Sequence, residues 1–397
     1  MSLTPFTKQQ LIPQEEKLEV GRHKSELFIG LPAETSYQER RICLTPDAVN
    51  SLTAHGHRVL IESGAGKSAS YSDKEYSDAG AEVTSDPHKV FSCPIILKVE
   101  PPTSKEIEMM NPETLLISAL QLKTQKKEFF ESLKAKKITA IAFEYIKDED
   151  GSYPAVKSLS EIAGTASILI AAELMISQKL GKGLLFGNIT GVSPTEVVIL
   201  GAGTAAEFAA KTAIGLGASV KVFDNSINKL RRLQNNLNQR IFTSTIQEKT
   251  LLKALMRCDV AIGAMRGKDR SPVVVSETMV ERMKRGAVII DVSIDTGGCF
   301  ETSDVTTHEK PTFVKHNVTH YCVPNIPSRY SKTASLSISN IISPFLLQMA
   351  DDGGIESAIR CNPGLKNGVY FYHGRLTNRS IGEWFTIDVT DINLLVF

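Results

Sequence analysis

The segment Val197-Val198-Ile199-Leu200-Gly201-Ala202-Gly203-Thr204-Ala205-Ala206 decides the fold of this chain. Its four leading apolar residues predict a buried strand, and the helical pattern that follows runs from Thr204 to Leu216. The first glycine of such a turn permits a tight bend, and the second lets the backbone approach a pyrophosphate. The small third residue lets helix and strand pack closely. We therefore expect Gly201, Gly203, Thr204, Ala205 and Ala206 to bind a dinucleotide at the N-terminus of the helix.

The next predicted strand covers 219–223. Asp224 follows it directly, eighteen residues after Ala206. An acidic residue here typically binds the ribose hydroxyls of NAD and repels the 2′-phosphate of NADP. The alternative is a solvated turn aspartate before Asn225. Because strand, turn, helix, second strand and acid follow in register, the sequence predicts NAD as the cofactor.

The rest of the chain alternates short apolar runs with helical stretches, which is the pattern of βα units. Long helices at 160–177 and 333–349 separate two such series. We expect an α/β protein with two Rossmann-like domains and parallel sheets, the first domain discontinuous, joined by the long helices with a cleft between the domains. The expected boundaries are 1–160 plus 340–397 for the substrate domain and 161–339 for the NAD-binding domain. Residues 1–25 are polar and predict an added arm or helix. The expected strands are 27–30, 58–62, 81–84, 94–99, 115–119, 138–143, 196–200, 219–223, 259–264 and 287–291.

Composition limits the classes of function. The chain has 397 residues, a net charge of +1 and interspersed basic and acidic side chains, so nothing favours nucleic acid or a membrane surface. The six cysteines lie far apart, which argues against disulfides and a thiolate metal site, and we expect no metal. The N-terminus lacks an apolar signal core and no apolar run reaches about 18 residues. We expect a cytoplasmic protein.

Four polar residues are expected where ligands collect, at the carboxyl ends of parallel strands. Arg41, Lys98 and Gln121 follow predicted strands of the first domain, and Asp295 follows one of the second. Arginine can grip a carboxylate with two hydrogen bonds, while lysine presents a compact charge that can polarise a carbonyl. The alternative is that these side chains are solvated residues at strand ends without a function. This alternative is weakest for Lys98, because the strand before it is so apolar. Together they predict a small anionic carbonyl substrate.

At these residues the sequence resembles the alanine dehydrogenase and proton-translocating transhydrogenase alpha-subunit family, over about residues 27–390. The two matching motifs nearest the C-terminus, 291–301 and 321–327, favour the alanine dehydrogenase branch. The motifs are Arg41-Ile42-Cys43-Leu44-Thr45-Pro46, Glu62-Ser63-Gly64-Ala65-Gly66, Leu97-Lys98-Val99, Ser160-Glu161-Ile162-Ala163-Gly164, the Gly201 turn, Asp291-Val292-Ser293-Ile294-Asp295-Thr296-Gly297-Gly298-Cys299-Phe300-Glu301 and Tyr321-Cys322-Val323-Pro324-Asn325-Ile326-Pro327.

The resemblance implies reversible oxidative deamination of L-alanine to pyruvate and ammonia, with hydride transfer to NAD, by a homohexamer that acts in amino-acid catabolism. Arg41 and Lys98 would bind the carboxylate and carbonyl of the substrate, and Asp295 would serve proton transfer. The remaining expected cofactor and substrate contacts are Ser160, Asp224, Lys229, Met265, Val292, Asp295 and Asn325, of which Asn325 also belongs to the substrate site.

One position departs from the family. Alanine dehydrogenases carry a catalytic histidine in a Leu-His-Leu segment, where this chain reads Leu120-Gln121-Leu122. Glutamine can position a substrate oxygen but cannot carry a proton near pH 7. Proton transfer would then need Asp295, Lys98 or water. Two alternatives stay open: a dehydrogenase for another 2-oxo acid or amine, and an NAD(H)-binding subunit like the transhydrogenase alpha subunit, which also has glutamine here.

Overall fold

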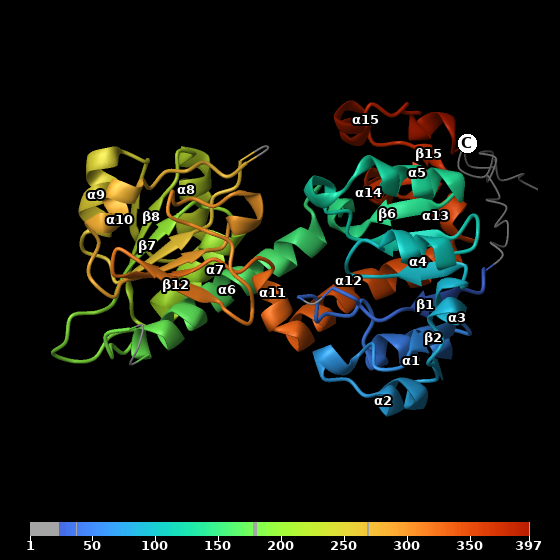
Figure 1. Ribbon diagram of the computed structural model, residues 1–397, viewed down its shortest axis with the longest axis horizontal. Helices are drawn as coiled ribbons and strands as arrows, with labels where there is room; N and C mark the ends of the chain where they lie inside the picture. The colour runs from blue at the N-terminus through green and yellow to red at the C-terminus, as the bar shows by residue number, and fades with distance from the viewer. Residues whose placement is uncertain (1–23, 37, 178–180, 268–269, 397) are drawn as a thin grey trace, which may run out of the picture.

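The computed structural model describes residues 24–36, 38–177, 181–267 and 270–396. The predicted N-terminal arm lies outside the described residues except for its last two positions. Two lobes, each built around one β-sheet, are joined by the long helices α6 (Pro154–Ile176) and α12 (Ser331–Asp351) (Figure 1). We call them the first and second domain in the order in which the chain enters them. The exact boundaries given above remain a prediction.

The first domain holds a sheet with the order β15-β14-β6-β5-β4-β1-β2-β3 among the described residues. From β3 to β6 this is the 3-2-1-4-5-6 order of a doubly wound dinucleotide-binding fold. Its strands are β1 (Phe28–Leu31), β2 (Arg58–Glu62), β3 (Glu82–Thr84), β4 (Ile95–Leu97), β5 (Leu115–Ser118), β6 (Thr139–Ala142), β14 (Val369–Tyr372) and β15 (Arg375–Leu376).

The second domain repeats the arrangement with the order β12-β13-β11-β10-β7-β8-β9 in the described part of the chain. Both sheets therefore reverse their strand order at one point, between β1 and β4 and between β7 and β10. Ligands of open α/β sheets bind beyond the carboxyl ends of the strands at such points. The strands are β7 (Glu196–Leu200), β8 (Ser219–Phe223), β9 (Phe242–Ser244), β10 (Val260–Gly263), β11 (Val288–Asp291), β12 (Thr312–Lys315) and β13 (Val318–Tyr321).

Both faces of each sheet are buried. In β4, Ile95 and Leu97 belong to one hydrophobic cluster and Ile96 to another, because successive side chains point to opposite faces. Helices cover both faces, as the continuous apolar strands require. The shorter helices are α1 (Pro46–Ala54), α2 (Asp73–Asp78), α3 (Pro87–Phe91), α4 (Ser104–Met109), α5 (Lys127–Ala135), α7 (Thr204–Gly215), α8 (Ile227–Asn236), α9 (Glu248–Leu255), α10 (Glu277–Glu281), α11 (Ile326–Arg329), α13 (Ile355–Cys361), α14 (Pro363–Gly368) and α15 (Arg379–Phe385).

The expected α/β fold with parallel sheets is confirmed for most strands, and each sheet also has an antiparallel edge. β12 pairs with β13, and β14 pairs with β15 and with β6, all antiparallel. Both hairpins close through two residues with positive φ, His316-Asn317 and His373-Gly374, a geometry that suits a two-residue turn. The C-terminal segment thus returns to the first domain, as expected, but it adds strands as well as helices.

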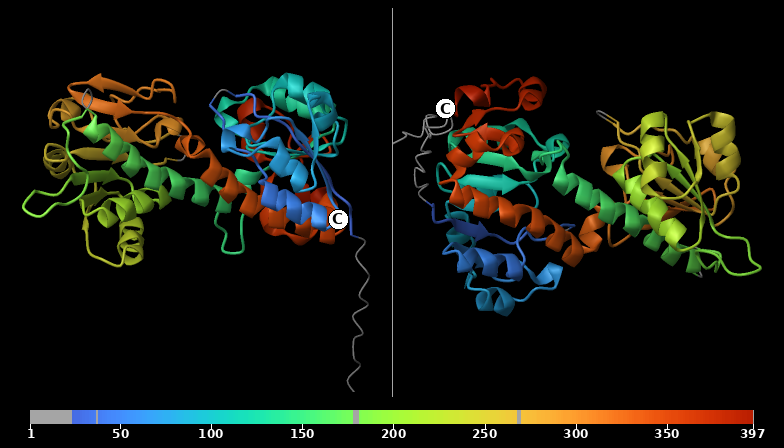
Figure 2. Two further views of the ribbon diagram at one scale, coloured as in Figure 1. Left: turned by 90° about the horizontal axis from the view of Figure 1, so that it is seen from below. Right: turned by 180° about the vertical axis from the view of Figure 1, so that it is seen from behind.

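Helices α6 and α12 pass between the domains and contact each other (Figure 2). Among the described residues, α6 is the one helix that is long and apolar enough (mean hydropathy 1.6) to cross a membrane. The expectation that no apolar run is long enough did not anticipate this helix. Its apolar character has a local cause. The helix packs against α7, α11, α12 and β11, and its buried residues, such as Ile168 and Ile170, belong to the core of the second domain.

Candidate active site

The glycine turn adopts the geometry that its sequence predicts. Gly201 has φ +105°, and a Cβ there would lie 2.4 Å from the carbonyl oxygen of Ala264. Gly203 precedes α7, and a Cβ on it would meet nothing within 4 Å. The first glycine is therefore required by the fold. The second leaves open space in front of the helix N-terminus, where a pyrophosphate can approach.

Asp224 lies beside this turn at the end of β8 and is only 6% exposed. Its Oδ2 accepts a hydrogen bond from the Ala202 N–H (2.8 Å), and its Oδ1 accepts one from the Ser226 N–H (2.7 Å). The solvated-turn alternative is therefore wrong. Each carboxylate oxygen keeps acceptor capacity, so the turn, the helix end and Asp224 together fit NAD.

We expect Asp224→Asn to narrow the preference for NADH over NADPH by about tenfold, equivalent to about 1.4 kcal/mol. The amide keeps one acceptor for the Ala202 N–H, loses the acceptor for the Ser226 N–H, and removes the charge that repels a 2′-phosphate. The measurement is kcat/KM with each reduced cofactor. Asn225→Ala, at the neighbouring exposed position, is the control. A wild-type preference for NADPH would contradict the assignment.

The other expected cofactor contacts lie around this turn with less defined roles. Met265 and Val292 are half-buried and follow β10 and β11; β10 pairs with β7, and β11 is the next strand beyond β10. Lys229 is exposed on α8. The Ser160 hydroxyl donates to the Val156 carbonyl inside α6 (2.7 Å), so it would have to turn away to contact a ligand.

Lys98 follows β4 at the point where the strand order of the first sheet reverses, and it is 1% exposed. Its Nζ lies 2.8 Å from Glu106 Oε1 and 3.4 Å from Glu34 Oε2. Burial alone would lower the pKa of Lys98, but the two carboxylates outweigh it and raise the pKa. The two carboxylates thus favour the charged ammonium of Lys98 despite its burial, which the apolar strand before it indicated.

Glu34 is the titratable member of this cluster. Burial raises the pKa of its carboxyl to about 7, although Lys98 acts in the opposite direction. Below that pH the Glu34–Lys98–Glu106 group carries one negative charge less than above it.

We therefore expect the KM for an anionic 2-oxo acid to rise by roughly threefold to tenfold as the pH passes from 6 to 8, because ionised Glu34 offsets the charge of Lys98. Initial rates with saturating NADH and ammonia measure this. In Glu34→Gln the neutral amide should remove the rise between these pH values. An unchanged profile in that variant would show that another group titrates.

Arg41 and Asn325 meet at a second buried carboxylate, Glu39. Arg41 Nε donates to Glu39 Oε1 (2.7 Å) and Nη2 to Oε2 (2.5 Å). Asn325 Nδ2 donates to the same Oε2 (3.1 Å). Burial would raise the pKa of Glu39, but Arg41 lowers it overall. The Asn325–Glu39 contact crosses from the second domain to the first, and Arg41 keeps guanidinium donors that Glu39 does not use.

Asp295 lies in the short helix η5 (Ile294–Thr296) beyond β11 and is exposed. The surrounding protein still removes enough water to raise the pKa of its carboxyl. The backbone N–H of Asn325, Arg266 and Arg41 act in the opposite direction. The structure therefore brings the predicted residues Arg41, Asn325 and Asp295 together.

Gln121 is exposed and has a left-handed backbone (φ 46°, ψ 50°) directly after β5. Glu144, after the neighbouring strand β6, holds this bend: its Oε1 accepts the N–H groups of Leu120 (2.7 Å) and Gln121 (3.3 Å). Its Oε2 is buried without a hydrogen-bond partner among the described residues. Burial raises the pKa of Glu144, while Arg266 of the second domain acts against this shift.

Sequence reasoning missed five charged residues of this site: Glu34, Glu39, Glu106, Glu144 and Arg266. Glu106 belongs to a Thr103-x-x-Glu106 capping box on α4. This pattern is typical of the surface end of a helix, so it gave no sign that Glu106 also contacts Lys98. The Glu39-x-Arg41 spacing was the one available signal, because a buried arginine needs a carboxylate partner.

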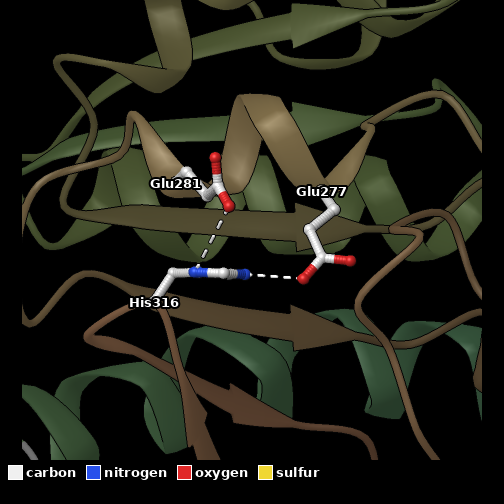
Figure 3. A group of neighbouring side chains, drawn as sticks. All are labelled: Glu277, Glu281 and His316. Carbon is white, nitrogen blue, oxygen red and sulfur yellow. Dashed lines mark hydrogen bonds and ion pairs between the residues drawn. The ribbon is translucent and has the colours of Figure 1, made fainter.

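One cluster of metal-ligand type occurs in the described part of the chain, at Glu277, Glu281 and His316 (Figure 3). Its two glutamates face different nitrogens of the imidazole, and Glu277 also pairs with Lys315 (2.8 Å). Lys315 thus already supplies a cationic partner to Glu277, and the His316 ring nitrogens already pair with both glutamates. The turn precedes β13, at the amino edge of the sheet, opposite the glycine turn.

The doubly wound second domain with its dinucleotide turn, together with the first domain and its buried Lys98 and Arg41, defines an NAD-dependent oxidoreductase. The models for the N-terminal and C-terminal domains of alanine dehydrogenase/PNT match residues 30–163 and 167–379. The chain belongs to this family.

Individual relatives agree with the family models. The chain is 36% identical to the alanine dehydrogenase of Mycolicibacterium smegmatis, covering 92% of this chain and 98% of the relative. It is also 36% identical to that of Bacillus subtilis, covering 90% and 94%. A solved L-alanine dehydrogenase matches with TM-score 0.85 and 33% identity, covering 91% of this chain and 99% of that one. A transhydrogenase from Sinorhizobium meliloti shares the fold (TM-score 0.75, 22% identity; 89% and 99% covered).

Proposed function

We propose that this chain catalyses the reversible oxidative deamination of L-alanine to pyruvate and ammonia. The observation that carries the proposal is the set of contacts from Arg41 through Glu39 and Asn325 to Asp295, with Lys98 beside it at the same sheet edge. These residues lie at the carboxyl ends of both sheets. A 2-oxo acid bound there would face the nucleotide turn of the second domain.

In the reductive direction Arg41 binds the substrate carboxylate with the donors that Glu39 leaves free. The Lys98 ammonium polarises the carbonyl oxygen as ammonia adds to the carbonyl carbon. Asp295 accepts and returns the protons that this addition and the loss of water require, helped by its raised pKa. Gln121 orients the substrate oxygen. Bound NADH would supply the hydride.

The test is oxidation of NADH with pyruvate and ammonium between pH 7 and 10, with NADH binding measured by fluorescence. We expect turnover, and faster turnover in Gln121→His, because a lost general acid–base group typically accounts for a factor of roughly 10² to 10⁴. Tight NADH binding with no turnover at any pH, in the wild type and in this variant, would favour an NAD(H)-binding subunit instead.

We further propose a cytoplasmic homo-oligomer, with a hexamer as the expected size. The segment between α6 and β7 extends from the second domain (Figure 1) and carries exposed apolar side chains, which typically mark a protein–protein interface. They are Leu184 (40% exposed), Leu185 (64%), Ile189 (53%) and Val192 (62%). Light scattering after gel filtration measures the assembly.

A further inference from the structure

The backbone around Arg41 lies in a largely buried segment without helix or strand, between β1 and α1. Three successive N–H groups of this segment each donate to a side-chain oxygen. The bonds run from Arg40 N–H to Ser328 Oγ (3.0 Å), from Arg41 N–H to Glu39 Oε1 (2.9 Å) and from Ile42 N–H to Ser335 Oγ (2.9 Å). A buried backbone donor needs such a partner where no helix or sheet supplies one. These oxygens therefore fix the backbone that carries the guanidinium.

Ser328 reaches this segment from the second domain. It lies in α11, which follows Asn325 and whose first residue belongs to the core of that domain. Its hydroxyl also donates to the Gln38 carbonyl (2.6 Å), so it bridges the backbone on both sides of Glu39. The Asn325 amide donates to the Glu39 carboxylate (3.1 Å). One turn of the second domain thus holds both the backbone and the side chain of the carboxylate that binds Arg41.

Helix α12 holds the rest of the segment. Ser335 and Ser339 are four residues apart, so they lie on one face of this helix. Ser339 Oγ accepts the N–H of Thr45 (3.1 Å), directly before α1 begins. Ser328, Ser335 and Ser339 are all 0% exposed, so water does not compete for their hydrogen bonds. The position of the Arg41 segment therefore depends on hydroxyl groups from the two helices that follow Asn325.

We propose that Ser328 and Ser335 are positioning residues for substrate binding, which hold the Arg41 backbone so that its free guanidinium donors meet the substrate carboxylate. The inference deepens the proposed function and rests on it, because it concerns the residue proposed to bind that carboxylate. Arg41 would bind the carboxylate equally before and during the reaction. Losing its position should therefore weaken substrate binding and leave the chemical step nearly unchanged.

The test measures two quantities: the KM for pyruvate with saturating NADH and ammonium, and the Kd of oxamate, an unreactive isostere of pyruvate, for the NADH complex. Ser328→Ala and Ser335→Ala should each raise both by about threefold to tenfold, the effect of one hydrogen bond. The kcat and the Kd for NADH should stay close to the wild-type values.

Ser167→Ala is the matched control. This serine is also 0% exposed, lies on α6 and donates to the Gly164 carbonyl (2.7 Å). Its replacement should lower the unfolding midpoint, as Ser335→Ala should, but leave the KM for pyruvate and the Kd of oxamate unchanged. The comparison separates the positioning of Arg41 from a general loss of stability.

Arg41→Lys shows whether the serines act through Arg41. Lysine keeps the charge but lacks the planar fork of donors, so adding Ser335→Ala to this variant should weaken oxamate binding by less than about twofold. Two results would overturn the inference: serine variants that match the Ser167→Ala control, or an effect of Ser335→Ala that adds in full to that of Arg41→Lys. Absence of turnover would refute the proposed function alone, because oxamate binding still tests the positioning. If the wild type neither turned pyruvate over nor bound oxamate, both would be wrong.

Discussion

Replacing Gly201 by valine is expected to abolish NADH binding, raising the Kd by at least about 100-fold, or about 2.7 kcal/mol. The residue has φ +105°, which a β-branched side chain adopts only under strain. Its Cβ would also lie 2.4 Å from the Ala264 carbonyl oxygen. The turn would have to open, and the helix N-terminus of α7 would move away from the cofactor.

Two further glycines separate loss of fold from loss of binding. Gly203→Ala should keep the thermal stability of the wild type but weaken NADH binding, because its Cβ meets no protein atom within 4 Å and projects into the space proposed for the pyrophosphate. Gly215→Ala, in the last turn of α7 and also without neighbours, should change neither. Fluorescence titration and thermal denaturation measure the two effects. If Gly203→Ala bound NADH with wild-type affinity, the pyrophosphate could not lie against Gly203, and the cofactor would have to bind elsewhere.

Replacing Lys98 by methionine is expected to lower kcat/KM for pyruvate by roughly 10²- to 10⁴-fold, since the ammonium is the charge that polarises the carbonyl. NADH binding, which depends on the other domain, should persist. The variant also leaves Glu34 and Glu106 buried without their shared cation. Breaking a buried ion pair in this way typically costs about 3–5 kcal/mol, so the unfolding midpoint should fall too.

The double variant Lys98→Met/Glu106→Gln distinguishes the two consequences. Removing one carboxylate should recover part of the lost stability but none of the lost activity. Lys105→Met, at the exposed neighbour of Glu106 on α4, is the matched control and should resemble the wild type. Activity that returns together with stability in the double variant would show that Lys98 serves the fold alone.

Local sequence was sufficient to predict a strand wherever the residues that define it all lie within one short segment. The expected strands at 58–62, 196–200 and 219–223 agree with β2, β7 and β8 residue for residue. The first two combine a continuous apolar run with a glycine or proline nearby, and 219–223 alternates apolar and polar residues shortly after Gly217. The antiparallel edge of the first sheet was missed because β14 is short and follows the long α12, and its pairing with β6 depends on residues more than two hundred positions away.

The residues of the site also divide into those that local sequence predicted and those that only the tertiary structure brought together. The sequence by itself determined the nucleotide turn, since Gly201, Gly203 and Asp224 act through backbone geometry within one βαβ unit. It also marked Arg41, Lys98 and Asp295 as strand-end residues, and Gln121 as the departure from the family. Only the tertiary structure decided their partners. Lys98 pairs with Glu34 and Glu106, and Asn325 of the other domain joins the local Glu39–Arg41 pair.

The physical reason is the range of the interactions involved. A turn or a helix is fixed by dihedral preferences and hydrogen bonds over a few residues, which the order of amino acids displays directly. The electrostatics of a buried group depend on which charges lie within a few ångströms and on how much water is excluded. Arg266 illustrates this: in the sequence it is one arginine among many, and its electrostatic interaction with Glu144 of the other domain exists only once both sheets have formed.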